Sequence, residues 1–177
     1  ILTLENYLCK LNKRNSFVLF GYSFLSFFLF NIVTTYWIWH ASIAGAFAAF
    51  VVNALLMSLV IVLFHNVKKI LGTFKGYLSL IFFWISMEYL HLNWELAWPW
   101  LTLGNVFATF PNIVQWYEYT GILGGTVWVL ILNLLLYAFF TYKEKEYVTY
   151  TVLILIVPII FSFAIKPNLD LSDKDIE

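Results

Sequence analysis

The chain has 177 residues, of which 62% are hydrophobic and 11% charged, and its formal net charge is zero. Soluble domains usually contain about 25% charged residues, so this chain has too few polar side chains to cover a surface that faces water. A net charge of zero gives no electrostatic basis for nucleic-acid binding. The composition therefore predicts an integral membrane protein.

Cys9 is the only cysteine of the chain, which excludes a disulfide within the chain and a CxxC metal site. It precedes the first long apolar segment, and we expect it to be a passive residue. The sequence starts at Ile1 without a methionine, inside a short apolar stretch. We expect this start to be truncated, or to be the end of a preceding membrane helix.

Five segments are long and apolar enough to cross a bilayer, whose core of about 30 Å needs roughly 20 helical residues. They cover residues 16–39, 42–65, 74–92, 114–140 and 148–165. The expected fold is an all-α bundle of about five transmembrane helices within a transmembrane domain, 1–165. Residues 166–177 are polar and acidic, and we expect them to be the truncated start of a periplasmic segment.

The distribution of basic residues predicts the orientation of this bundle. With five crossings, eight Lys and Arg residues fall on one side, and only Lys166 and Lys174 fall on the other. The eight are Lys10, Lys13, Arg14, Lys68, Lys69, Lys75, Lys143 and Lys145. Because cytoplasmic loops carry the excess of Lys and Arg, we expect a multi-pass protein of the bacterial inner membrane with a periplasmic C-terminal tail.

Several positions in the first two helices favour close helix packing. Small residues recur every fourth position in the second helix, at Ala41, Gly45 and Ala49, and such spacing lets backbones approach closely in lipid. The first helix also contains the polar residues Asn31 and Thr35, and the second contains Asn53. We predict that these three form hydrogen bonds between helices.

Residues 86–126 carry the polar groups that can have a function. Glu88 lies inside an apolar helix, where an ionisable group costs several kcal/mol unless it is paired or hydrated. Glu88, His91 and Glu95 share one helix face, but a helical metal site of this type needs a second Glu-x-x-His motif, which the sequence lacks. We predict no metal and no cofactor, and we expect Glu88, His91 and Glu118 to be buried polar residues.

A proline between two tryptophans, Trp98-Pro99-Trp100, is expected to end the third helix. Residues 93–113 then form an apolar loop on the outer leaflet, which either contacts acyl chains or acts as a structural lid. The candidate lipid-facing residues of this loop are Trp94, Trp98, Pro99, Trp100, Gly104, Phe107 and Phe110.

These motifs resemble those of the apolipoprotein N-acyltransferase family, and the residue pattern is most similar to its Bacteroidetes-type branch. The matching elements, in chain order, are Tyr36-Trp37 with Ser42, Glu88-Tyr89-Leu90, Trp98-Pro99-Trp100, Leu103-Gly104, Gln115, and Gly121 through Gly124. The similarity extends over roughly residues 16–165. Two positions depart from the family, which often has arginine where His91 stands and glycine where Ala97 stands.

The resemblance implies eight membrane helices that carry a nitrilase-like α/β domain with a Glu-Lys-Cys triad. It also implies transfer of an acyl chain from a phospholipid to the N-terminal amine of a diacylglyceryl-cysteine lipoprotein. The five helices would then be the third to seventh of the family. None of the triad can be placed here, so we expect no catalytic residue in this chain, which would be a membrane-domain fragment.

Two other classes stay open at the level of sequence. One is a small transporter or ion-binding bundle that uses Glu88, His91 and Glu118. The other is a non-catalytic membrane scaffold.

Overall fold

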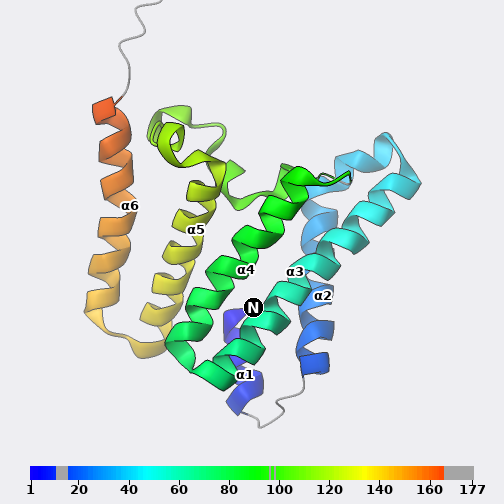
Figure 1. The fold of residues 1–177 in the computed structure, drawn as a ribbon, viewed down its shortest axis with the longest axis horizontal. Coiled ribbons are helices and arrows are strands. Elements are labelled where there is room, and N and C mark those ends of the chain that lie inside the picture. The colour runs from blue at the N-terminus through cyan, green and yellow to red at the C-terminus, as the bar shows by residue number, and fades with distance from the viewer. Residues whose placement is uncertain (11–15, 96, 98, 166–177) are drawn as a thin grey trace, which may run out of the picture. The chain divides into compact units, whose positions relative to one another are not determined.

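The computed structural model describes residues 1–10, 16–95, 97 and 99–165, and the expected all-α membrane fold is confirmed. The described residues contain no strand. The helices are α1 (Leu2–Lys10), α2 (Ser16–Thr35), η1 (Tyr36–His40), α3 (Ile43–Leu71), α4 (Thr73–Asn93), η2 (Pro99–Leu101), η3 (Leu103–Phe107), η4 (Pro111–Ile113), α5 (Tyr117–Tyr142) and α6 (Lys145–Ile165), where η marks 3-10 helices. They form two compact units, Ile1–Thr102 and Leu103–Glu177 (Figure 1).

Four helical segments among the described residues are long and apolar enough to cross a membrane. They are Ser16–His40, Ile43–Leu71, Tyr117–Tyr142 and Lys145–Ile165. The remaining predicted crossing corresponds to α4, which is not among them. A helix of 21 residues is roughly 30 Å long, so α4 has the length to cross, and its crossing stays a prediction.

In the first unit, α2 packs against α3 (Figure 1). The buried residues of α2 recur every fourth position, at Leu19, Ser23, Phe27, Asn31 and Thr35, as expected for one face of a helix. On this face the Asn53 side-chain amide donates to Asn31 Oδ1 at 2.7 Å. The predicted hydrogen bond between helices is confirmed for this pair. It is wrong for Thr35, which donates to the Asn31 carbonyl of its own helix.

The end of α3 and its packing face both differ from the sequence-based expectation. The helix continues past His65 to Leu71 because polar residues do not interrupt its backbone hydrogen bonds. It ends where Gly72 adopts a φ of 87°, a conformation that favours glycine. Its buried small positions are Ala46 and Ala54, whereas the predicted packing residues Ala41 and Gly45 are exposed and Ala49 is half-buried.

In the second unit, α5 and α6 lie side by side (Figure 1) and share an unusual backbone contact. Pro158 lies inside α6 and has no backbone N–H, so the carbonyl of Ile154, four residues earlier, loses its partner within the helix. The indole Nε1–H of Trp128, on α5, donates to that carbonyl at 2.6 Å. The contact between α5 and α6 therefore satisfies a backbone group that lipid could not.

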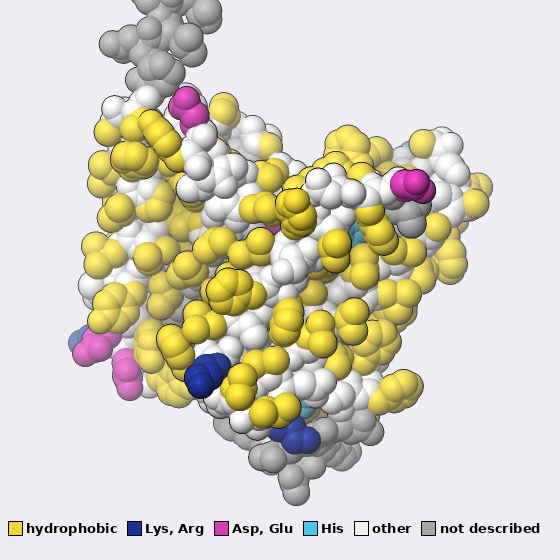
Figure 2. Space-filling model, in the orientation of Figure 1, with side chains coloured by type: hydrophobic (Ala, Val, Ile, Leu, Met, Phe, Trp, Pro, Cys, Tyr) yellow, Lys and Arg dark blue, Asp and Glu magenta, His cyan; other side chains and the backbone are white. Residues whose placement is uncertain are grey.

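Apolar side chains cover much of the outer surface. Figure 2 shows that hydrophobic side chains dominate the visible face, with few acidic or basic ones. In α6 only 6% of the most apolar stretch is buried, and Leu153, Val157 and Phe163 are among its exposed side chains. Exposed apolar area of this extent marks a surface that contacts lipid or protein rather than water.

The Trp128–Ile154 hydrogen bond gives a direct test of the packing of α5 against α6. Trp128→Phe should destabilise the detergent-solubilised chain by about 1–3 kcal/mol, because the Ile154 carbonyl is left without a donor. In a Pro158→Ala background the cost should be smaller, since the restored N–H serves that carbonyl. A double-mutant cycle of unfolding measurements checks this, with Trp39→Phe at an exposed position as the control. An equal cost in both backgrounds would contradict the assignment.

Candidate functional site

The C-terminal half of α4 buries several polar side chains. Trp84, Met87, Glu88 and His91 are all buried, and their spacing of three and four residues places them on one face. The Glu88 carboxylate accepts a hydrogen bond from Trp84 Nε1 at 3.0 Å. The buried carboxylate of Glu88 therefore has a hydrogen-bond partner within the protein, as an ionisable group in an apolar helix requires.

His91 differs from the other buried polar residues because both of its ring nitrogens lack a hydrogen-bond partner among the described residues. Its exposed fraction is only 5%. A buried polar atom without a partner costs about 1–3 kcal/mol. Ser23 and Trp116 each have one such atom, but His91 has two on one ring. Its contact with Trp94 is between rings, with centroids 5.3 Å apart.

The His91 ring lies between two apolar cavities of the first unit. One cavity, of about 270 Å³, is lined by His91 and by a row of small α3 residues, namely Gly45, Ala48, Ala49, Val52 and Asn53, together with Ala97. The other, of about 210 Å³, lies on the α3–α4 contact and is lined almost entirely by apolar side chains, with Ser86 and His91 as its polar exceptions. Ligand cavities commonly start near 300 Å³ and place few polar groups in apolar walls.

We call this arrangement the His91 cavity pair. Its larger cavity lies at the end of the first unit where α4 stops and α3 starts, and its smaller cavity extends along the middle of α3. Lys68, Lys69 and Lys75 lie around the turn between these helices. The separation along α3 from Gly45 to Lys68 is roughly 35 Å at 1.5 Å per residue. The cavity next to Gly45 and the basic end are thus at opposite ends of the same unit.

The predicted lipid-facing residues of the first unit follow α4 in the chain, close to the end of α4 that carries His91. Trp94 is exposed, and Trp100 is 60% exposed while its ring contacts Trp37 edge-on at 5.4 Å. Pro99 is half-buried at the start of η2. Trp98 lies outside the described residues. Aromatic side chains in such positions are typical of a membrane interface.

The predicted residues of the second unit surround a close backbone contact. Gly104 is buried, its N–H donates to Thr126 Oγ1 at 3.1 Å, and its carbonyl accepts from Tyr117 Oη at 3.1 Å. A Cβ at Gly104 would collide with the carbonyl oxygen of Ile122. Phe107 is half-buried, and its ring packs on that of Trp128 with the centroids 4.8 Å apart, so its contact with lipid stays a prediction.

Phe110 is 64% exposed, and its role as a lipid-facing residue stays a prediction. Within α5, Gly121 has a φ of 65° and interrupts the helix, which turns the first residues of α5 away from the helix axis. Glu118 lies in that first turn and is exposed, which corrects the expectation that it is buried. Glu95 is exposed as well. Of the polar residues expected to be buried together near the end of α4, only Glu88 and His91 are buried.

Sequence reasoning missed the lining of the larger cavity. Gly45, Ala48 and Val52 are apolar residues of a helix that is apolar on all sides, and nothing local distinguishes a cavity wall from a packing face. The spacing of Gly45 and Ala49 is a signal in the sequence, but it predicts helix packing equally well.

These features define the class of the protein. It is an all-α membrane domain with an irregular aromatic segment between its membrane helices and a buried imidazole beside an apolar cavity. The family model of the apolipoprotein N-acyltransferase N-terminal domain matches residues 3–135. The chain therefore belongs to the apolipoprotein N-acyltransferase family.

A curated relative supports this assignment. The chain is 30% identical over 126 residues to the apolipoprotein N-acyltransferase of Chlorobaculum tepidum. The match covers 71% of this chain and 24% of that protein, so the chain spans about a quarter of the length of its relative. No solved structure matches the chain.

Gly104 provides a test of the irregular segment in the second unit. Gly104→Ala should lower stability by about 1–3 kcal/mol, the usual cost of overpacking, because the added methyl group meets the Ile122 carbonyl. Gly21→Ala is the matched control, since nothing lies within 4 Å of a Cβ at Gly21 and alanine favours the helix. Thermal unfolding in detergent measures both. If Gly104→Ala is as harmless as Gly21→Ala, the close contact is wrong.

Proposed function

We propose that this chain is the membrane domain of an enzyme that transfers an acyl chain from a phospholipid to the N-terminal amine of diacylglyceryl-cysteine lipoproteins. Family membership supports the acyltransferase activity, and the proposed substrates are those that the family resemblance implies. In this proposal the chain contributes no catalytic residue. Its role is to anchor the enzyme in the bacterial inner membrane and to receive lipid at the outer leaflet.

The His91 cavity pair is the observation that carries the lipid-receiving role. The larger cavity has mostly apolar walls, which suit an acyl chain, and His91 is one of its lining residues. The buried ring nitrogens of His91 have no hydrogen-bond partner among the described residues, so a small movement of the ring would offer a donor to a ligand. A neutral imidazole N–H can donate to the carbonyl oxygen of a lipid ester. Such a bond would recover much of the about 1–3 kcal/mol that the unpartnered ring costs. In this proposal the cavity receives part of one acyl chain, and His91 binds its ester.

The orientation of the chain supports the same role. The excess of Lys and Arg at the other end of the first unit favours a cytoplasmic position for that end. The end with His91, Trp94 and Trp100 would then lie at the outer leaflet. There it would meet the phospholipids of that leaflet.

The expected effect of His91 on acyl transfer is specific. In a bacterium depleted of its own N-acyltransferase and supplied with the whole gene, His91→Ala should reduce N-acylation of lipoproteins at least tenfold, the equivalent of about 1.4 kcal/mol. His91→Arg should preserve activity, because arginine also donates and often occupies this position in the family. Mass spectrometry of lipoprotein N-terminal peptides measures the third acyl chain.

His40→Ala is the control, because His40 is an exposed imidazole of η1 outside the His91 cavity pair. Protein amount in the membrane must be equal for all variants. Unchanged acylation in His91→Ala would refute the role of His91. If the whole gene supports no acylation while its protein accumulates, the acyltransferase assignment fails. Loss of cation uptake in the double variant Glu88→Gln with His91→Ala would then favour an ion-binding bundle.

A further inference from the structure

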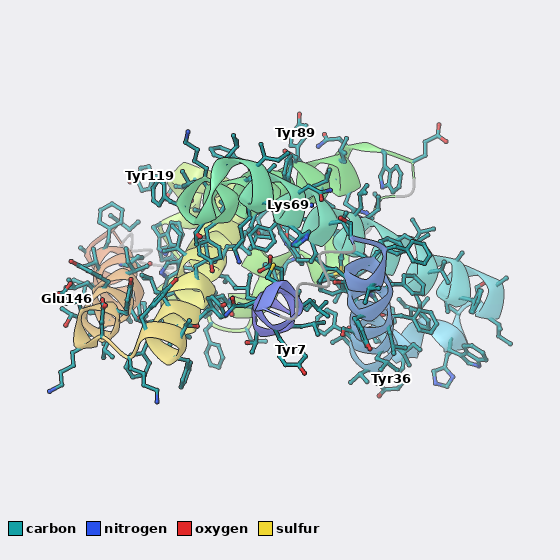
Figure 3. All side chains as sticks on the ribbon, turned by 90° about the horizontal axis from the view of Figure 1, so that it is seen from below. Tyr7, Tyr36, Lys69, Tyr89, Tyr119 and Glu146 are labelled. Carbon is teal, nitrogen blue, oxygen red and sulfur yellow. The ribbon has the colours of Figure 1, made fainter. Side chains whose placement is uncertain are left out.

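A second polar cluster lies at the opposite end of the first unit, between α1 and α3. Glu5 and Cys9 are one turn apart on α1, and His65 and Lys68 are in the last turns of α3. Glu5 is 1% and His65 3% exposed. Figure 3 shows Tyr7, on the opposite side of α1, pointing away from α3 and α4. The face of α1 with Glu5 and Cys9 is therefore the face turned to the bundle.

Three atoms of this cluster form a small triangle. His65 Nδ1 lies 2.9 Å from Glu5 Oε1, Cys9 Sγ lies 3.2 Å from the same oxygen, and Cys9 Sγ lies 3.9 Å from His65 Nδ1. A tetrahedral zinc ion with bonds of about 2.0–2.3 Å holds its N, O and S ligands roughly 3.4–3.6 Å apart. The observed edges bracket this value, so shifts of a few tenths of an ångström would complete the geometry.

The fourth member of the cluster holds the carboxylate in place. Lys68 Nζ pairs with the other oxygen, Glu5 Oε2, at 2.5 Å, which leaves Oε1 directed toward Cys9 and His65. Partners of this kind, outside the ligand set, commonly fix the orientation of metal ligands. A cavity of about 180 Å³ adjoins the cluster and is lined by Glu5, Cys9, His65, Lys68, Lys69 and Thr73. It provides an entry path and room for water as a fourth ligand.

We propose that Glu5, Cys9 and His65 bind a divalent transition-metal ion, with zinc as the ion that best fits a carboxylate, thiolate and imidazole set. The thiolate disfavours magnesium and calcium, which prefer oxygen ligands alone. This proposal departs from our expectation of no metal and of a passive Cys9. It is independent of the acyltransferase assignment.

Proton balance is simple at this site. In the metal-free cluster the Cys9 thiol and the His65 Nδ1–H both donate to the ionised Glu5 carboxylate. On binding, the zinc ion forms a bond to Cys9 Sγ, and the thiol proton leaves to water. The imidazole transfers its Nδ1 proton to Nε2 through water and binds the ion through Nδ1. No oxidation or reduction occurs, and the ion links α1 to α3.

Cobalt substitution and metal analysis test the proposal on the whole chain in detergent. We expect one zinc per chain, and a thiolate-to-cobalt absorption band when Co²⁺ replaces it. Cys9→Ser and His65→Gln should each weaken zinc binding at least tenfold. Lys68→Met should weaken it about tenfold, as for other partners of metal ligands. His40→Ala, at an exposed histidine, should leave the affinity unchanged.

A measurement without substitution covers the case in which a variant does not fold. Zinc should slow alkylation of Cys9 by a maleimide at least tenfold, a chelator should reverse this protection, and magnesium should have no effect. Absence of both the cobalt–thiolate band and the protection, in folded protein, would overturn the proposal. The cluster would then be an ion pair and hydrogen-bond network that only attaches α1 to α3.

Discussion

Hydrocarbon offers no hydrogen-bond partner, so a polar group inside a membrane helix must find its partner within the protein. This constraint organises both units. Asn53 bonds to Asn31 between α2 and α3, and Trp128 serves the Ile154 carbonyl that a proline leaves without a donor. Against this background, the two ring nitrogens of His91, which have no hydrogen-bond partner in the part of the chain that the structure describes, are an exception. A site that leaves a donor unsatisfied in an apolar cavity is suited to a ligand that brings an acceptor.

The positions of the long helices could be predicted from the sequence because a helix that crosses a bilayer needs an apolar run of roughly 20 residues. The sequence predicted their rotation poorly. In α3 the small-residue series was placed at Ala41, Gly45 and Ala49, whereas the packed series includes Ala46 and Ala54. The difference of one residue is a rotation of about 100°. A helix that is apolar on all sides gives hydropathy no means to choose between these faces.

Contacts distant along the chain could not be predicted for a related reason. Glu5 and His65 are sixty positions apart. The sequence predicts a passive Cys9 because it precedes the first long apolar segment, and nothing local places His65 beside it. The short α1 brings these side chains to the end of α3 only through tertiary packing. Similarly, the irregular segment before α5 depends on the close approach of Gly104 to Ile122, which no local motif encodes.

The most direct test of the account is photolabelling by a phospholipid that carries a diazirine at the end of its acyl chain. In reconstituted vesicles, the account predicts concentrated label on the α3 residues that line the larger cavity, Ala48 and Val52 among them. Ala49→Phe, which fills this cavity, should abolish that label and leave the label on exposed α6 residues unchanged. Uniform labelling of all lipid-facing helices, unaffected by Ala49→Phe, would contradict a lipid-receiving cavity beside His91.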